Sequence, residues 1–199
     1  RYDHMQQHTG QHVLSAAFVR IPNVPTLSFH TGSEVSTIDL AKEITPLEIA
    51  MAEDEANRIV WENRPVTVRY ASPEEAAALP LRKEPARRGR LRLIDIEHFD
   101  LSACGGTHVS RTGSIGVIAV SGWERFKGGQ RLEFVCGGRA LARMRALRDV
   151  TTASARRLSV LPADLPAAIE RLQAETRDQK RVLTAQQSEL ARYRALDLA

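Results

Sequence analysis

"HMQQHTGQHVLSAAFVR", residues 4–20, combines a helical pattern with a row of histidines. Apolar residues recur at helical spacing and Pro22 lies just past the expected end of the helix. The histidines, His4, His8 and His12, follow one another at intervals of four. Because residues four apart lie on one helix face about one turn apart, two of these imidazoles can chelate one metal ion. The stretch therefore predicts a helix that offers a pair of metal ligands.

A second pair of metal-binding residues stands far along the chain, in "ACGGTH", residues 103–108. Cys104 and His108 flank two glycines, which let the backbone curl round an ion. A thiolate with imidazoles suits zinc above the other common ions, and four such ligands complete a tetrahedral site. We expect His8, His12, Cys104 and His108 to bind Zn²⁺. His4 then belongs to a surrounding shell or to the surface.

The kind of zinc site stays open at this point. Four protein ligands are typical of a closed, structural zinc, whereas catalysis needs an open position or a ligand that loosens. A zincin metalloprotease requires Glu immediately after the first His, and here that residue is Thr9. The spacing thus argues against proteolysis by that route.

Helices and strands alternate irregularly along the first 140 residues, which favours the α+β class, an antiparallel sheet with packed helices. Residues 26–40 and the segment around "RFKGGQ", residues 125–130, predict hairpins. Thr45, Pro46 and Glu48 form a capping box that begins a helix over residues 46–62. Further expected elements are strands over 65–71 and 90–97 and a short helix over 72–79.

The composition changes after Gly138, and we divide the chain into residues 1–140, 141–161 and 162–199. The first is the zinc-containing domain and the second a helical connector. The third carries apolar and polar residues at alternating spacings of four and three, a pattern that predicts a long coiled-coil arm and, through it, a homodimer. A single amphipathic helix lying on the domain is the alternative.

Charge and composition narrow the class of partner. The chain has 199 residues, a net charge of +4 and no window as long as a membrane span, so we expect no membrane partner. Cys104 and Cys136 could pair, but a domain with a sizeable core hardly needs a disulfide, so we expect reduced thiols and a cytoplasmic location. Residues 82–92 and 139–157 are rich in Arg and Lys, which suits a polyanion but also fits a solvated surface. The chain opens without Met, so we read it as a fragment of a longer protein.

Four segments, "DHMQQHTGQHVLSAAF", "SFHTGSEVSTIDL", "CGGTHVSRTGSIGVI" and "KGGQRLEFVCGGRAL", resemble the editing domain of alanyl-tRNA synthetase and, more closely, the free-standing AlaX editing proteins. The resemblance covers residues 1–140 and implies the editing-domain fold shared by alanyl- and threonyl-tRNA synthetases. It implies zinc at His8, His12, Cys104 and His108. It also implies hydrolysis of serine, and sometimes glycine, from mischarged alanine tRNA. The helix after Asp164 resembles the stalk of the longest members, cut short at Ala199.

Editing has its own physical requirement. A site that hydrogen-bonds a hydroxyl rejects the analogue lacking it, so polar groups must lie beside the reacting ester. Strand alternation places Ser28 and His30 on one face, with Thr31 at the start of the turn, and we expect these three to line the pocket. An ordinary strand and turn would use the same residues.

Contacts with tRNA are expected in two places. They are the basic loop and the glycine turn, with Arg87, Arg88, Arg90, Lys127, Gly128, Gly129 and Arg131. A hairpin turn that needs glycine is the simpler explanation of "FKGGQR".

Three other functions remain open. They are a zinc-stabilised tRNA-binding module without catalysis, the cis-editing domain of an alanyl-tRNA synthetase, and a coiled-coil assembly piece.

Overall fold

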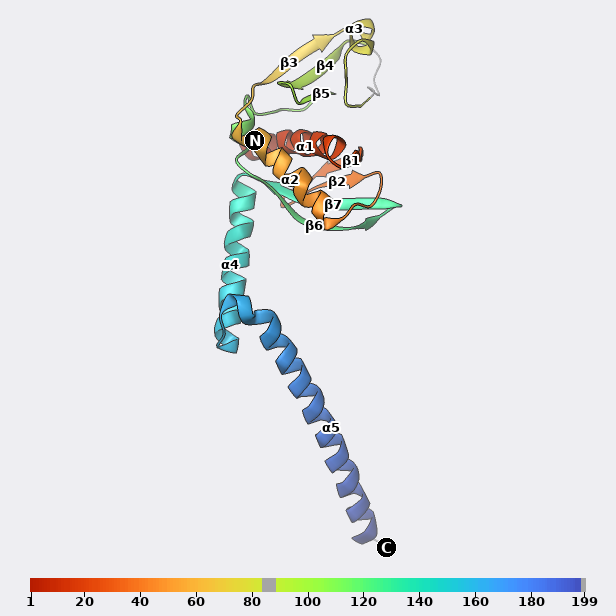
Figure 1. Cartoon of the computed structure of the whole chain (residues 1–199), viewed down its shortest axis with the longest axis vertical. Coiled ribbons are helices and arrows are strands. Elements are labelled where there is room, and N and C mark those ends of the chain that lie inside the picture. Colours follow the sequence, from red (N-terminus) through yellow and green to blue (C-terminus); the bar gives the residue numbers. More distant parts are fainter. Residues whose placement is uncertain (84–88, 198–199) are drawn as a thin grey trace. The chain divides into compact units, whose positions relative to one another are not determined.

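The computed structural model describes residues 1–83 and 89–197, and these form two compact units, Arg1–Arg143 and Met144–Ala199. The first unit has two antiparallel sheets (Figure 1). The expected α+β class with antiparallel pairing is confirmed. The sequence predicted one sheet, and this prediction is wrong. A short strand that was not expected completes a second sheet.

The larger sheet has the strand order β1-β2-β7-β6. Its strands are β1 (Thr26–Thr31), β2 (Ser36–Leu40), β6 (Ile118–Phe126) and β7 (Gly129–Cys136). Both predicted hairpins are present, but Thr31 ends β1 and pairs with Ser36 instead of beginning the turn. Lys127 and Gly128 both have positive φ, as a two-residue turn of type I′ requires. A Cβ on Gly129 would lie 2.0 Å from the carbonyl oxygen of Leu40, so the close approach of β7 to that backbone requires glycine.

Helix α1 (Tyr2–Arg20) lies between the two sheets and is buried almost all round (Figure 1). Its apolar residues share one core with β2 and β7 on one side and with Ile94 and Ile96 of the smaller sheet on the other. A Cβ on Gly10 would lie 2.3 Å from Sγ of Cys136, so this glycine lets α1 pack against β7. Helix α2 (Pro46–Trp61) packs beside α1 and begins with the predicted capping box.

The smaller sheet has the order β3-β4-β5, with β3 (Val66–Ala71), β4 (Leu91–Ile96) and β5 (Asp100–Ala103). Its outer face packs on the short helix α3 (Pro73–Ala77) in a separate small core. Strand β5 has only four residues, and its inward side chains, Asp100 and Ser102, are polar but buried. A short 3-10 helix, η1 (Thr112–Ile115), follows the loop that leaves β5.

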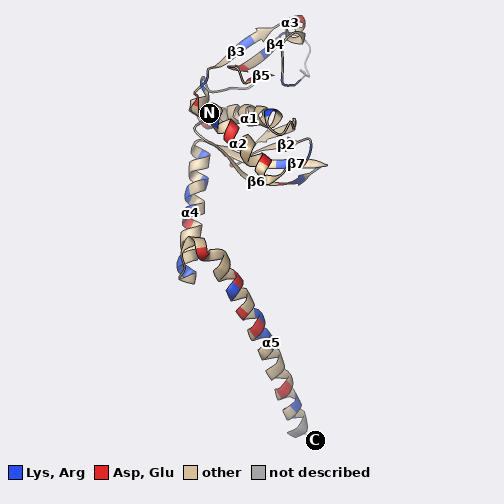
Figure 2. Cartoon of the chain, in the orientation of Figure 1, with Lys and Arg blue, Asp and Glu red and all other residues tan. Residues whose placement is uncertain are grey.

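Helix α4 (Gly138–Leu158) begins in the first unit and continues into the second, which also holds η2 (Pro162–Asp164) and α5 (Leu165–Asp197). Basic residues dominate α4, whereas α5 carries both signs (Figure 2). A long C-terminal helix is therefore confirmed, but a single helix is not a coiled coil, and the arm stays a prediction in that respect. Among the described helices, none is long and apolar enough to cross a membrane.

Candidate metal centre

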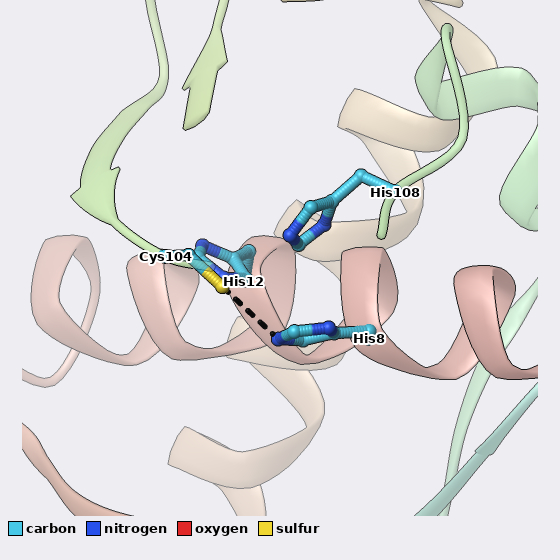
Figure 3. Close-up of side chains that lie close together, drawn as sticks. All are labelled: His8, His12, Cys104 and His108. Atoms are coloured by element: carbon cyan, nitrogen blue, oxygen red, sulfur yellow. Dashed lines mark hydrogen bonds between the residues drawn. The ribbon is translucent and has the colours of Figure 1, made fainter. Parts of the chain in front are cut away.

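His8, His12, Cys104 and His108 lie together at the face of α1 that is turned toward the smaller sheet (Figure 3). One ligand atom from each lies within 4.8 Å of the other three, and Sγ of Cys104 is 3.3 Å from Nε2 of His8. A filled tetrahedral zinc site places such atoms roughly 3.3–3.6 Å apart. The four ligand atoms therefore lie close enough together for one ion to be bound by all of them. His4, on the same helix, is exposed.

Hydrogen bonds at the far side of two rings turn the other nitrogens toward a common point. Nδ1 of His12 lies 3.1 Å from the carboxylate of Asp100 and donates to it. The hydroxyl of Thr9 donates to the carbonyl of Met5, so its oxygen accepts from Nδ1 of His108 at 3.4 Å. Both rings then keep a lone pair on Nε2. Nε2 of His108 is buried without a hydrogen-bond partner among the described residues, which is expected of a metal ligand.

Cys104 is poised to act as a thiolate. Burial alone raises the pKa of its thiol, but the three neighbouring imidazoles and the backbone N–H of Gly106 outweigh burial and lower the pKa to about 3. Burial lowers the pKa of His108 and so favours its neutral form. Burial opposes the charge of His12, but Asp100 and Cys104 raise its pKa, so zinc binding at this ring would release a proton. A thiolate and imidazoles are the ligand types that zinc prefers, so the donor set fits this ion.

Asp100 is the residue of this site that the sequence analysis missed. Its buried carboxylate contacts Nδ1 of His12 and accepts from Nε of Arg82 at 2.6 Å and from the hydroxyl of Ser102. Burial opposes its charge, but His12 and Arg82 keep the pKa of Asp100 below its usual value. A carboxylate behind a metal-binding histidine fixes the orientation of the ring. Nothing in the local sequence pairs Asp100 with His12, 88 positions away.

The loop that carries Cys104 is held close to α1 by two features. Nη1 of Arg92 donates to the carbonyls of Cys104 and Gly106 at 2.7 and 2.8 Å. A Cβ on Gly106 would lie 2.1 Å from Cε1 of His8, whereas a Cβ on Gly105 would meet nothing within 4 Å. The two glycines therefore differ, and it is Gly106 that lets the loop reach the histidine.

The predicted pocket residues on β1 divide between two faces of the sheet. The ring of Phe29 stacks on His8 with centroids 5.6 Å apart, so odd-numbered positions of this strand face the metal cluster. Thr31 shares that face. Ser28 donates to Asp39 on the opposite face, and alternation puts the exposed His30 on the same side as Ser28.

The predicted tRNA contacts are placed as follows. Arg87 and Arg88 lie outside the described residues. The guanidinium of Arg90 lies 4.9 Å from the ring centroid of the exposed Tyr70. Lys127 and Gly128 form the turn between β6 and β7, and Gly129 begins β7. Arg131 makes a two-point ion pair with Asp39, at 2.7 and 3.0 Å, and stacks on Phe126.

Comparison with known proteins finds relatives of two kinds, alanyl-tRNA editing proteins and alanine–tRNA ligases. Residues 91–133, which include Cys104 and His108, match the threonyl and alanyl tRNA synthetase second additional domain. The alanyl-tRNA editing protein AlaX-L of Pyrococcus horikoshii is 35% identical over 86% of this chain and 43% of its own length. The alanine–tRNA ligase of Pyrococcus furiosus is 34% identical over 100% of this chain and 23% of its own. An alanyl-tRNA editing protein of Danio rerio is 35% identical over 71% of this chain and 35% of its own.

The chain thus spans less than half the length of these relatives. Its resemblance to the alanyl-tRNA editing proteins, expected from the sequence, is confirmed: the chain carries the second additional domain of threonyl and alanyl tRNA synthetases over residues 91–133 and is a relative of both the AlaX editing proteins and the alanine–tRNA ligases.

Proposed function

We propose that this chain is an aminoacyl-tRNA deacylase that removes serine, and also glycine, from mischarged alanine tRNA. The observation that carries the proposal is the gathering of His8, His12, Cys104 and His108 into one cluster. The names of the relatives, alanyl-tRNA editing proteins among them, supply the substrate class.

The four residues of the cluster would hold a zinc ion. When bound, that ion supplies positive charge beside the ester, which lowers the pKa of water and favours attack at neutral pH. In the reaction, the oxygen of water forms a bond to the ester carbonyl carbon, and the bond from that carbon to the ribose oxygen breaks. The proton lost by the water goes to the ribose oxygen, and free serine leaves.

Partial exposure of the cluster supports catalysis over a purely structural metal. Only His12 of the four ligands is fully buried, while His8, Cys104 and His108 are half-buried. Three of the four residues therefore reach the surface in part, which supports an open catalytic site over a closed one. The four protein ligands still favour a closed zinc, so a zinc-stabilised tRNA-binding module without catalysis is the second candidate.

Among the three pocket residues predicted on β1, Thr31 is the one that the strand register favours. It lies on the face of Phe29, whose ring contacts His8. We infer that its hydroxyl selects serine over alanine, because a site built to bond a hydroxyl rejects the substrate that lacks it. Ser28 and His30, on the opposite face, would act in the reaction only by supporting the strand.

The test is a deacylation panel with serine, glycine and alanine esters on alanine tRNA, run with the metal-loaded protein and after chelation. We expect the serine ester to be hydrolysed fastest and chelation to stop the reaction. Retained tRNA binding with no hydrolysis of any ester would select the binding module instead. Hydrolysis of the serine ester by the isolated chain would also show that editing needs no attached ligase. This point matters because both an editing protein and a ligase are similar to the chain.

The proposed substrate also gives the partner and the location of the protein. Alanine tRNA is the partner, and a protein that edits it works where translation occurs, in the cytoplasm. A homodimer through α5 stays a proposal, since its exposed apolar residues recur at coiled-coil spacing.

A further inference from the structure

The turn between β1 and β2 follows Thr31, the residue that we infer to select serine. The N–H of Gly32 donates to the carbonyl of Val35 at 3.0 Å, and a Cβ on Gly32 would lie 2.6 Å from that oxygen, so the turn requires glycine. Ser36 pairs with Thr31 and therefore shares its face. The hydroxyl of Ser36 is buried without a hydrogen-bond partner among the described residues. The end of this hairpin thus places two hydroxyls on the face that is turned toward the metal cluster.

The backbone of this turn is tied to the rest of the domain by Arg139, in the first turn of α4. Nη1 of Arg139 donates to the carbonyl of Gly32 at 2.8 Å. Nε and Nη2 of the same guanidinium donate to the two carboxylate oxygens of Asp3, on the first turn of α1, at 2.9 and 2.7 Å. The side chain of Arg139 is 12% exposed. A planar guanidinium holds its N–H groups in fixed directions, so one side chain sets the distance between the turn and α1.

Asp3 is itself fixed to the helix that carries two of the metal ligands. Its carboxylate also accepts from Nε2 of Gln7 at 3.3 Å. Gln7 is fully buried, and its side chain bonds both the N–H and the carbonyl of Cys136, at 2.8 and 3.0 Å. The hydrogen bond from Arg139 holds the pKa of Asp3 below its usual value, so this carboxylate is ionised at neutral pH. The turn is therefore anchored to the same helix that supplies the histidine pair.

Resting on the proposed function, we propose that Arg139 is a positioning residue for the selection of serine. Its hydrogen bonds go to Asp3 and Gly32, so it acts through the backbone next to Thr31 and not on the ester. A side chain that must bond the hydroxyl of serine has to be held to within about 0.5 Å. Without Arg139 the turn can move away from α1, and the site then discriminates less between an ester with a hydroxyl and one without.

The other role open to this guanidinium is purely structural, an ion pair that ties α4 to α1. The two roles differ in a measurable way. An ion pair that only stabilises the domain would affect hydrolysis of the serine and the alanine ester alike, whereas a positioning residue changes the ratio of their kcat/KM values. That ratio is therefore the quantity to measure.

The kinetic test uses the metal-loaded 199-residue chain and the serine and alanine esters of alanine tRNA. Arg139→Met keeps the apolar stem and removes the N–H donors, and the ratio of kcat/KM for serine to that for alanine should fall about 10- to 100-fold, up to the loss that a 1 Å misplacement causes. Arg139→Lys keeps the charge without the planar fork and should give an intermediate ratio, which also serves as the test if Arg139→Met does not fold. Arg58→Met, which removes a two-point ion pair with Glu55 on α2, is the matched control and should keep the wild-type ratio. A wild-type ratio in every folded Arg139 variant would overturn the proposal.

Amide hydrogen exchange separates this proposal from the proposed function, because it needs no substrate. In the Arg139 variants the N–H of Gly32 should exchange about 10-fold or more faster than in the wild type, while the N–H of Phe134 in β7 should be unchanged. If the wild type hydrolyses no ester but exchange at Gly32 rises, the proposed function fails and Arg139 still holds the turn. If the wild type prefers serine and neither the exchange nor the ratio changes, the function stands and the role assigned to Arg139 is wrong.

Discussion

The metal cluster and the outer face of the larger sheet are both polar, but they differ in the balance of hydrogen-bond donors and acceptors. On the outer face, which we define by Ser28, Asp39 and Arg131, the carboxylate of Asp39 accepts from both other residues, so donors and acceptors match. In the metal cluster, acceptors outnumber donors: a thiolate and three imidazoles converge, and Nε2 of His108 is buried without a hydrogen-bond partner among the described residues. A group of converging acceptors needs a cation, whereas a matched network is complete in itself. The comparison distinguishes a ligand site from a structural network made of similar residues.

Substitution of Cys104 is expected to have the largest effect on metal binding. Cys104→Ala removes the thiolate, and we expect metal affinity to fall more than about 100-fold, beyond the range of losses caused by residues behind the ligands. Competition with a colorimetric chelator measures this affinity. Cys136→Ala is the matched control: it should cost about 1 kcal/mol of stability because that thiol is buried in the core, and keep full metal binding. Loss of metal from both variants would contradict the assignment.

Asp100 is expected to show the next largest effect. Asp100→Asn keeps the shape but loses the charge that orients His12, so metal affinity should fall about 10- to 100-fold. The control is Asp95→Asn, which breaks the Asp95–Arg69 ion pair on the other face of the same sheet and should leave metal affinity unchanged. Equal affinities of the two variants would show that Asp100 does not support the ring.

Gly105 and Gly106 are expected to differ in their effect on metal binding. Gly106→Ala places a Cβ against His8 and should cost about 1–3 kcal/mol of stability and several-fold in metal affinity, because the loop must retreat from α1. Gly105→Ala adds its Cβ to open space and should change neither. Thermal unfolding and chelator competition on both variants measure the difference. A harmless Gly106→Ala would mean that the loop approaches α1 less closely than the structure shows.

The outer face should give the smallest effect, and one that depends on pH. Arg131 holds the pKa of Asp39 below its usual value, so the pair adds stability above the unfolded pKa of about 3.9 and loses it as pH falls through the lower, folded pKa. Asp39→Asn should cost about 1 kcal/mol near pH 7 and nothing at the acid end, with metal affinity unchanged. Denaturant unfolding at a series of pH values measures this change in stability. Reduced metal affinity of Asp39→Asn would show that the outer face supports the metal cluster, contrary to this expectation.

The sequence predicted the part of the site that depends on local geometry. The spacing of His8 and His12 on a helix determines their relation without any knowledge of the rest of the fold, and the "CGGTH" motif does the same for Cys104 and His108. Local patterns also predicted helix α2, from its capping box, and the two hairpins, from their turn residues.

The part of the site that the sequence did not predict depends on which faces of the strands and helices pack against each other. Alternation grouped Ser28 with His30 correctly, but only the position of α1 shows that Phe29 and Thr31 face the cluster. Asp100 sits on a four-residue strand without a propensity signal, and its partners Arg82 and His12 come from other parts of the chain. Long-range pairings of this kind have no local sequence pattern.

X-ray absorption spectroscopy of the zinc-loaded chain identifies the atoms that bind the ion. We expect one bound ion with one sulfur neighbour at about 2.3 Å and three nitrogen neighbours at about 2.0–2.1 Å, and a loss of the sulfur signal in Cys104→Ala. A spectrum with no sulfur neighbour in the wild type, or a chain that retains no zinc after purification, would contradict this expectation.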